Sequence, residues 1–297
     1  MPSPKISICI PTYQGETYLQ EALDSILAQD FQDIEVIISD DASSDATLDI
    51  AERFKAVAAF PVHIHKHTPQ GIGANWNHSV SLAKGEYIKF LFQDDVLLPY
   101  CLKKMSTSLD AHPELGMVSS KRTFIIEGDS ETEELKRWLS LYSDLQSQFK
   151  GVHKPFLRLD KSIFSMESFF SSPLNKVGEP SVYMFRRSVF YEIGPFREDL
   201  KQILDYEFCY RLLKKKDIAI LPDTLVAFRI HAAQATNVNR QVDIPDYRIY
   251  ERLLYDEYRD LLHPSLRTKL VKKYHPFYIL KDKVSLKLRL SMKKFFP

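Results

Sequence analysis

Apolar and polar residues alternate along the first 120 residues in a way that predicts strands and helices in turn. Short runs rich in Ile, Val, Tyr and Phe are typical of buried strands, and apolar residues recurring every three or four positions are typical of amphipathic helices. The expected strands cover residues 5–13, 35–41, 62–66, 87–92 and 117–119, and the expected helices cover 17–29, 44–57, 74–82 and 99–109. Repeated strand–helix units predict a mostly parallel sheet with helices on both faces.

The regular pattern breaks between residues 127 and 175, where an acidic loop precedes a stretch of weak periodicity. An excursion of this length within a domain commonly carries function, and we expect it to contact an acceptor substrate. Regular elements return afterwards: a strand and helix at 181–194, a helix at 204–216, a pair of strands at 217–222 and 225–231, and one or two helices at 246–273.

The composition is that of an ordinary soluble globular protein, with 44% hydrophobic and 27% charged residues among 297. No run approaches the roughly 18 apolar residues of a membrane span, and the first residues lack the apolar core of a signal peptide, so we expect a cytoplasmic protein. Cys9, Cys101 and Cys209 are far apart and show no CxxC spacing. They predict buried thiols in a reducing compartment, and neither a zinc site nor a disulfide framework.

The net charge of +1 conceals an acidic body and a basic C-terminal segment. Residues 265–297 hold ten Lys or Arg and one acidic residue, interleaved with Leu, Val, Met and Phe. That mixture suits an anionic membrane surface, where each basic residue contributes about 1 kcal/mol. A solvated terminal helix that packs its leucines on the body fits the same pattern. Nucleic acid is disfavoured as a partner, because the body is acidic and no recognition motif is present.

Two adjacent carboxylates, Asp94 and Asp95, follow the expected strand at 87–92. Buried like charges repel each other, and a divalent cation with oxygen ligands would compensate them. Capping of the next helix explains one acidic residue equally well, so the pair alone leaves both interpretations open. Because α/β sheets bind ligands beyond the carboxyl ends of their strands, we expect the polar strand ends at 11–13, 40–41 and 94–95 to line one crevice.

Taken in order, these segments resemble the family-2 glycosyltransferases, which are inverting enzymes of the GT-A fold. The resemblance spans residues 5–239 and rests on PTYQGETYLQEALDSILAQDFQDIEVIISDDASSDAT, GIGANWNHSVSLAKGEYIKFLFQDDVLLP, GEPSVYMFRR, ILDYEFCYRLLKK and FRIHAAQATN. It implies an α/β, GT-A-like (Rossmann-like) domain over 1–240, with a mostly parallel sheet flanked by helices. Residues 1–120 would be its nucleotide-binding half and 121–240 its acceptor and catalytic-base half, followed by a helical, basic tail at 241–297.

The resemblance implies a nucleotide-binding role for five residues. Tyr13 would stack on the nucleobase, since an aromatic face suits any base. Asp41 would accept a hydrogen bond from a base N–H, such as that of uracil, thymine or guanine. Pro11 and Asn77 would complete the nucleotide pocket, and Asp94 would contact the ribose.

The resemblance also implies a metal and diphosphate site. Asp95 would ligate Mg²⁺ or Mn²⁺, both of which suit carboxylate and phosphate oxygens, and such a cation assists departure of the diphosphate as a Lewis acid. His231 is a second candidate ligand. Arg229 and Gln234 would contact the diphosphate from the same late motif.

A catalytic base is the remaining requirement, since a single displacement needs a carboxylate that takes the proton of the acceptor hydroxyl. Asp205 matches the Asp of the family's Glu-Asp motif, although Leu204 replaces the preceding Glu. Asp205 also suits the start of a helix, where the helix dipole stabilises a negative charge. Glu179 would bind a sugar hydroxyl on the acceptor side.

The implied function is transfer of a sugar, with inversion, from a nucleoside-diphosphate donor (a UDP-sugar favoured) to a hydroxyl of a glycan or lipid-linked saccharide. The family implies polysaccharide assembly for the bacterial cell envelope, with the enzyme peripheral at the inner face of the membrane. A sugar-1-phosphate nucleotidyltransferase is an alternative, but PTYQGETY lacks the Gly-rich loop and nearby Lys that it needs. A catalytically silent, nucleotide- or glycan-binding partner subunit is the other alternative. Leu204 and Trp76, which stands where many relatives carry Arg, favour it, whereas Asp41, Asp95 and Asp205 disfavour it.

Overall fold

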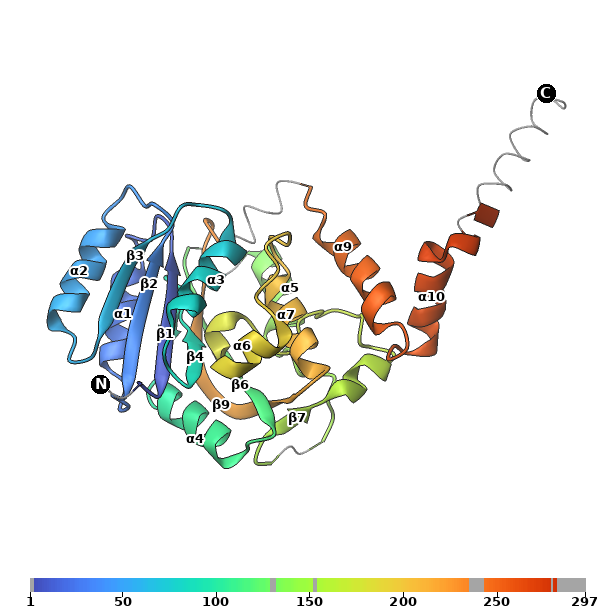
Figure 1. Cartoon of the computed structure of the whole chain (residues 1–297), viewed down its shortest axis with the longest axis horizontal. Coiled ribbons are helices and arrows are strands. Elements are labelled where there is room, and N and C mark those ends of the chain that lie inside the picture. The colour runs from blue at the N-terminus through green and yellow to red at the C-terminus, as the bar shows by residue number, and fades with distance from the viewer. Residues whose placement is uncertain (1–2, 129–131, 152–153, 235–242, 279, 282–297) are drawn as a thin grey trace, which may run out of the picture. The chain divides into compact units, whose positions relative to one another are not determined.

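The structure is a computed structural model that describes residues 3–128, 132–151, 154–234, 243–278 and 280–281. The chain forms two compact units (Figure 1). The first unit comprises Met1–Asp160 and Ser172–Ile244, and the second comprises Lys161–Ser171 and Pro245–Pro297.

A single sheet forms the centre of the first unit, and the described residues contribute nine strands to it. The strands are β1 (Ile6–Thr12), β2 (Ile34–Asp40), β3 (Val62–Lys66), β4 (Tyr87–Phe90), β5 (Val96–Leu97), β6 (Leu115–Ile126), β7 (Leu157–Leu159), β8 (Tyr183–Arg186) and β9 (Asp217–Ile230). Their order is β3-β2-β1-β4-β8-β6-β9-β5, and β7 pairs with β9. Strands β1 to β4 run parallel, as do β6 and β9, whereas β8 is antiparallel to both of its neighbours.

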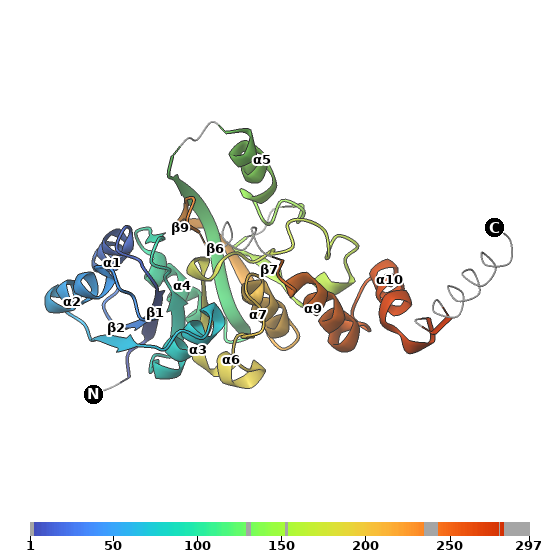
Figure 2. The same ribbon diagram turned by 90° about the horizontal axis from the view of Figure 1, so that it is seen from above.

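Helices cover both faces of the parallel strands (Figure 2), which confirms the predicted α/β architecture. The helices of the first unit are α1 (Leu19–Leu27), α2 (Thr47–Val57), α3 (Ile72–Leu82), α4 (Cys101–Ala111), α5 (Glu133–Tyr142), η2 (Pro180–Val182), α6 (Arg187–Ile193) and α7 (Leu204–Leu213). Successive side chains of a strand point to opposite faces. Accordingly, Ile8 of β1 joins the apolar core shared with α1, α2 and α4, whereas Ser39 of β2 meets His78 of α3 at 2.8 Å.

The strand pair expected at 217–222 and 225–231 is instead one continuous strand, β9. Pro222 favours a turn in the sequence, but β9 runs beside the long strand β6, and the two shift register around Ser119 and Lys121. A bulge of this kind bends a strand without ending it. The bend carries the end of β9, with Arg229, to β5 beside the acidic pair.

Helix α5 lies within the region that was expected to be irregular. Thr132 caps it by accepting a hydrogen bond from the N–H of Leu135 at 3.3 Å, and Glu133 begins its first turn, where a negative charge is favourable. The helix buries none of its residues, so it adds little to the apolar core of the unit. Trp138 anchors it edge-to-face on Phe124, with ring centroids 5.7 Å apart.

The second unit is helical in its described part, as the pattern at 246–273 predicts. It contains η1 (Lys161–Ser165), α9 (Asp246–Leu253), the π-helical turn η3 (Leu254–Tyr258) and α10 (Pro264–Tyr274). Tyr258 packs edge-on against Phe164 with ring centroids 5.2 Å apart. No helix in the described part of the chain is long and apolar enough to cross a bilayer. The basic segment predicted at 265–297 is described only in part, because 282–297 lie outside the described residues.

Candidate active site

Three polar strand ends lie together at the carboxyl edge of the sheet, as expected. Thr12 of β1 is in register with Asp40 of β2, and the N–H of Asp41 donates to the carbonyl of Thr12 at 2.9 Å. On the other side of β1, the amide of Gln93 accepts from the N–H of Tyr13 at 2.9 Å and donates to its carbonyl at 3.0 Å. These bonds hold the loops after β1, β2 and β4 against one another.

The adjacent residues Asp40 and Asp41 have different surroundings. Asp40 is fully buried and accepts hydrogen bonds from Thr12 Oγ1 at 2.9 Å and from the N–H and hydroxyl of Ser43 at 2.8 and 2.6 Å. It therefore stabilises the turn after β2. Among the described residues, the side chain of Asp41 has one hydrogen-bond partner, His67, whose Nδ1 lies 2.5 Å from Oδ1. Asp41 is thus the member of the pair with an oxygen available for a ligand.

Of the other predicted nucleotide residues, Tyr13 is the most accessible, with 58% of its surface exposed. Pro11 is the second-last residue of β1 and is in register with Ser39 of β2. Asn77 makes three hydrogen bonds through its amide, all to the loop at 196–198: it donates to the Phe196 carbonyl at 2.9 Å and to Glu198 at 3.0 Å, and accepts from the Phe196 N–H at 2.9 Å. Its nucleotide role stays a prediction that would act through this loop.

Trp76 is a core residue in this fold. It is 8% exposed, and its ring lies 5.0 Å from that of Phe92 and 5.3 Å from that of Phe196. The position where many family-2 relatives carry Arg is therefore filled by aromatic packing, so any charge on a diphosphate must be met by other residues.

The acidic pair comprises one accessible and one buried carboxylate. Asp94 is partly exposed, and its Oδ2 lies 3.0 Å from Nε2 of His231. Asp95 is 1% exposed, and its Oδ1 accepts from the N–H of Arg229 at 3.0 Å. Burial, and then the neighbouring Asp94, hold the pKa of Asp95 well above its ordinary value.

Oxygen Oδ2 of Asp95 is buried and accepts no hydrogen bond of good geometry from the described residues, and the Ser181 hydroxyl near this carboxyl only partly offsets the effect of burial on its pKa. A buried carboxylate oxygen without a donor, beside a second carboxylate, is the arrangement that a divalent cation would satisfy. The atoms that could coordinate a metal here are mainly carboxylate oxygens, which suit Mg²⁺ or Mn²⁺. No cluster of three or more His, Cys, Asp or Glu side chains suited to a metal occurs in the part of the chain that the structure describes. The protein would therefore supply only part of a coordination shell.

Arg229 is enclosed by partners. Its side chain is 4% exposed, and its guanidinium carbon lies 4.6 Å from the ring centroid of Tyr18. Nε donates to the carbonyl of Asp94 at 2.9 Å, and the two terminal nitrogens pair with Glu21 and Glu127. Arg229 thus fixes the loop that carries the acidic pair, and its predicted contact with a diphosphate would require release from one glutamate.

The rest of the late motif is ordered by Gln234 and Tyr18. The amide of Gln234 donates to the carbonyl of Arg229 at 2.7 Å and accepts from the N–H of His231 at 3.3 Å. The rings of His231 and Tyr18 lie 4.9 Å apart. These contacts direct His231 toward Asp94, so the late motif and the acidic pair form one cluster.

Asp205 lies in the first turn of α7 and is half-buried. Asn175 donates to its Oδ2 at 2.8 Å, whereas Oδ1 is buried without a side-chain partner in the described residues. Burial raises the pKa of Asp205 to about 7, and nearby Glu179 adds to the rise. Glu207, the other acidic residue of this turn, is bound by Arg211 at 3.0 and 2.9 Å. Asp205 is therefore the carboxylate of this turn that is equipped to exchange a proton.

Glu179 belongs to the same side of the site. Its Oε2 lies 3.1 Å from Nε of Arg122. The preceding residue, Gly178, has φ of +121°, a conformation that a side chain would strain. Its N–H donates to Oδ1 of Asn175 at 2.9 Å, so Asn175 links the Glu179 loop to Asp205.

Three polar residues of this site were not predicted from the sequence: His67, Asn75 and Asn175. Asn75 is 4% exposed, and its Oδ1 is buried without a partner in the described residues. Its place on the first turn of α3, two residues before Asn77, could have drawn attention to it. The alternation of histidines in VHIHKH marks one face of β3 and could have drawn attention to His67. Asn175 lies in an aperiodic segment that carries no such signal.

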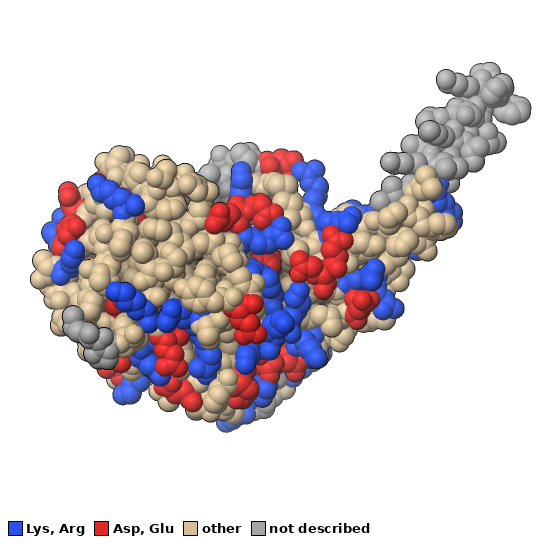
Figure 3. Space-filling view, viewed as in Figure 1, with Lys and Arg blue, Asp and Glu red and all other residues tan. Residues whose placement is uncertain are grey.

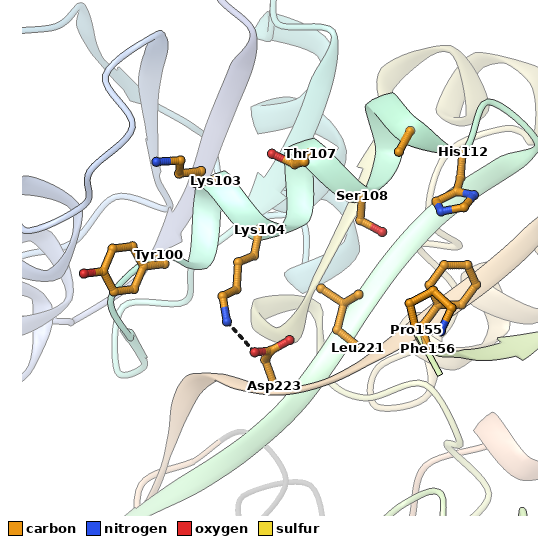
Figure 4. Close-up of a pocket in the computed structure, with 11 residues that line it drawn as sticks. Tyr100, Lys103, Lys104, Thr107, Ser108, His112, Pro155, Phe156, Leu221 and Asp223 are labelled. Atoms are coloured by element: carbon orange, nitrogen blue, oxygen red, sulfur yellow. Dashed lines mark hydrogen bonds and ion pairs between the residues drawn. The ribbon is translucent and has the colours of Figure 1, made fainter. Parts of the chain in front are cut away.

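A cavity of about 580 Å³ lies elsewhere in the first unit, between α4 and the bend of β9 (Figure 4). Phe156 and Leu221 provide apolar walls, and Lys104 pairs with Asp223 across it. None of the residues predicted for catalysis or nucleotide binding lines this cavity. Its size therefore does not identify the reaction centre.

Comparison with known proteins supports the predicted fold. Residues 7–194 match the family model described as glycosyl transferase family 2. An uncharacterized protein of Mycobacterium tuberculosis is 30% identical over 238 residues, which cover 78% of this chain and 69% of that protein. The GalNAc(5)-diNAcBac-PP-undecaprenol beta-1,3-glucosyltransferase of Campylobacter jejuni is 29% identical over 208 residues, 66% of either chain. The crystal structure of S. aureus TarS 1–349 in complex with UDP-GlcNAc aligns with a TM-score of 0.64 and 21% identity, covering 91% of this chain and 71% of that one.

Proposed function

We propose, from the premise that this chain belongs to glycosyl transferase family 2, that it moves a sugar from a nucleoside diphosphate, with UDP favoured, to a hydroxyl of a glycan or lipid-linked saccharide. The observation that carries the proposal is the Asp205 carboxyl group. Its pKa is raised to about 7 by burial, and one of its oxygens has no side-chain partner among the described residues. A group that titrates near the working pH is the most effective general base.

The donor half of the proposal rests on the strand ends of residues 1–120. Tyr13 would stack on the base, with 58% of its surface available, and Asp41 would accept the base N–H through the oxygen that His67 leaves free. Asp94 would meet the ribose. The solved complex of TarS with UDP-GlcNAc, which shares the fold, supports a uridine nucleotide as the first donor to test.

The diphosphate would lie at the acidic pair. Asp95 would hold Mg²⁺ or Mn²⁺ through its unpartnered oxygen, with Asp94 and His231 beside it. One or two carboxylates suffice, because phosphate oxygens and waters complete the shell of such a cation. When bound, the cation neutralises negative charge on the diphosphate as a Lewis acid. Gln234 and Arg229 keep the acidic loop in place for this contact.

The chemical step would be a single displacement. Asp205 takes the proton of the acceptor hydroxyl as that oxygen bonds to the anomeric carbon. The bond from that carbon to the diphosphate oxygen breaks, and its electron pair leaves with the nucleoside diphosphate. Attack opposite the leaving group inverts the anomeric configuration. Asn175 donates a hydrogen bond to Oδ2 of Asp205, so Oδ1 would be the oxygen that takes the proton.

The acceptor would meet the half of the domain at 121–240, and Glu179 would bind one of its sugar hydroxyls. The C. jejuni relative is named for a saccharide carried on PP-undecaprenol, which supports a lipid-linked saccharide as the acceptor class. Assembly of a cell-envelope polysaccharide at the inner face of the membrane follows from that acceptor. The basic segment within 241–297 would provide peripheral contact with anionic lipid.

The test is transfer from UDP-, GDP- and dTDP-sugars to lipid-linked and free saccharides, read as release of the nucleoside diphosphate with Mn²⁺ present. Product anomers determined by NMR decide between inversion and retention. Asp205→Asn is the matched variant: it should bind the donor as the wild type does and release acceptor-dependent nucleotide about 10²- to 10⁴-fold more slowly. Turnover in Asp205→Asn at the wild-type rate would exclude Asp205 as the base. Nucleotide binding without turnover on any acceptor would favour a silent partner subunit.

A further inference from the structure

We propose that His67 is a positioning residue for base recognition: it fixes Asp41 so that one carboxylate oxygen faces the nucleobase. The inference rests on the proposed function, in which Asp41 reads the base of the donor. No motif of the sequence analysis includes His67, and its role is inferred from its place beside Asp41.

His67 is held rigidly at the end of β3. Strand β3 pairs in parallel with β2, with Lys66 opposite Asp40. One residue further on, the N–H of His67 donates to the carbonyl of Asp40 at 2.7 Å. The backbone of His67 is therefore fixed next to Asp41. Rotation about the side-chain bonds of His67 is enough to bring its ring to the carboxylate.

The contact between His67 and Asp41 is short and sheltered. Nδ1 of His67 lies 2.5 Å from Oδ1 of Asp41, and the two side chains are 14% and 11% exposed. A hydrogen bond to a carboxylate is strong and directional. The backbone of Asp41 is also held, because its N–H donates to Thr12 and the next residue, Ala42, has φ of +58°. With one oxygen and the backbone fixed, the second oxygen has a defined direction.

Neighbouring histidines support the ring of His67 from one side. His78 of α3 lies with its ring centroid 4.7 Å from that of His67, and its Nδ1 is 2.8 Å from Ser39 Oγ. His65 contacts His78 in turn, at 6.2 Å between centroids. Burial, then proximity to His67 and His65, lowers the pKa of His78. Helix α3 itself contains no Lys, Arg, Asp or Glu, and the surface over it is largely without such residues (Figure 3).

A fixed carboxylate oxygen discriminates between bases by their hydrogen-bonding edge. Uracil and thymine carry N3–H and guanine carries N1–H, all of which can donate to it. Cytosine and adenine carry a lone pair at the corresponding ring nitrogen, which the carboxylate repels. A carboxylate that faces a lone pair instead of an N–H loses its hydrogen bond, and such a loss discriminates strongly between ligands. Loosening Asp41 should therefore cost affinity for UDP and leave affinity for CDP nearly unchanged.

The experiment measures binding of UDP and CDP to the full chain by calorimetry with Mn²⁺ present, for wild type and five variants. His67→Leu removes the donor, whereas His67→Asn keeps a side-chain N–H near the position of Nδ1. His63→Leu is the matched control, because His63 shares the same face of β3 and contacts Glu35 and not Asp41. Asp41→Ala, alone and combined with His67→Leu, completes a double-mutant cycle.

We expect His67→Leu to weaken UDP binding about tenfold, the loss of one charge-assisted hydrogen bond, with CDP binding unchanged. His67→Asn and His63→Leu should stay within about threefold of wild type for both nucleotides. In turnover assays, His67→Leu should raise KM for the donor and leave kcat unchanged. The cycle should be non-additive, because Asp41→Ala already removes what His67 positions.

The inference is overturned if His67→Leu keeps the UDP-to-CDP preference of wild type, or if the two substitutions add. If His67→Leu does not fold, loss of UDP preference in His67→Phe with retention in His67→Asn supports the inference, and equal preference in both overturns it. If wild type binds GDP in place of UDP, the same comparison is made with GDP and ADP. Failure of wild type to bind any of these nucleotides would instead overturn the proposed function, and the inference with it.

Discussion

Nε2 of His231 lies 3.0 Å from Oδ2 of Asp94, although 137 positions separate the two residues in the chain. The bend of β9 brings them together. At the same end of the strand, the N–H of Arg229 donates a hydrogen bond to Asp95. The late motif therefore belongs to the diphosphate side of the proposed site. Asp205 and Glu179, joined through Asn175, would form its acceptor side.

The pH dependence of turnover should follow the Asp205 carboxyl group. Burial raises its pKa to about 7, and only the deprotonated form can take a proton. We expect kcat at saturating donor and acceptor to fall as the pH falls through about 7, with a limiting slope of one proton. Asp205→Asn should lower kcat about 10²- to 10⁴-fold, the usual contribution of a general base. A flat rate profile between pH 5.5 and 8 would contradict this assignment.

The same substitution should stabilise the fold at neutral and alkaline pH. The folded-state pKa of about 7 exceeds the ordinary value of 3.8, so the folded protein binds the proton more tightly than the unfolded chain. Stability from this group is present below about pH 4 and is lost as the pH rises through about 7. Because Asn resembles the protonated acid, Asp205→Asn should raise the free energy of unfolding by about 1–3 kcal/mol at pH 8.

Urea denaturation at pH 8 and pH 4.5 checks this difference, which should shrink at the lower pH. Glu207→Gln is the control: Glu207 is bound by Arg211, so its loss should destabilise the fold at both pH values. Equal destabilisation by Asp205→Asn at both pH values would show that its carboxylate is not strained by burial.

Sequence patterns predicted the features whose cause is local. The apolar run before Asp94 and Asp95 predicted a buried strand that ends in carboxylates, and family motifs directed attention to Asp205. The partners that give these residues their properties are distant in sequence. Asn175 reaches Asp205 from an aperiodic segment, and His67 reaches Asp41 from another strand. Periodicity contains no information on such pairings, because only the folded sheet brings them together.

Backbone continuity was hard to predict for a related reason. Pro222 favours a turn, yet β9 continues through it beside β6, because pairing with a long neighbouring strand outweighs one local preference. Asn77, the residue of α3 that was predicted to bind the nucleotide, shows the same effect. Its amide is fully used by the loop at 196–198, a contact that no motif could indicate.

Stabilisation by nucleotide should depend on a divalent cation and on Asp95. UDP at about 100 times its dissociation constant should add roughly 2.7 kcal/mol to the stability of the fold. We expect this gain with Mn²⁺ and its loss with EDTA or in Asp95→Ala, measured as a shift in Tm. Asp110→Ala is the control, because Asp110 pairs with Lys5 away from the acidic pair. An equal shift in Asp95→Ala would remove Asp95 from the metal site.

Arg229 should matter for stability as well as for ligand binding. Its buried guanidinium joins Glu21, Glu127 and the carbonyl of Asp94. Arg229→Met should cost about 1–3 kcal/mol, less than a fully buried pair because both glutamates reach solvent. Lys103→Met is the exposed control and should stay within about 0.5 kcal/mol. Urea denaturation measures both, and similar small effects would show that the cluster does not hold the acidic loop.

The basic C-terminal segment has one part that packs within α10 and another, residues 282–297, that lies outside the described residues. In α10, Leu270 is fully buried, and Lys269 and Lys273 pair with Glu251. These residues have a role within their own unit, so a truncation before α10 would remove more than charge. The five Lys and Arg among residues 282–297 are the part to test for membrane contact.

A chain that ends at residue 281 should therefore lose binding to anionic vesicles while its Tm stays unchanged. Each basic residue contributes about 1 kcal/mol near an anionic surface, so loss of five should weaken the partition coefficient by about 3.5 orders of magnitude. Replacing the same five residues with Gln tests charge without shortening the chain and should have a similar effect at low salt. Sedimentation with vesicles of anionic and of zwitterionic lipid measures both variants. If the truncated chain sediments with anionic vesicles as the full chain does, residues 282–297 are not the membrane contact.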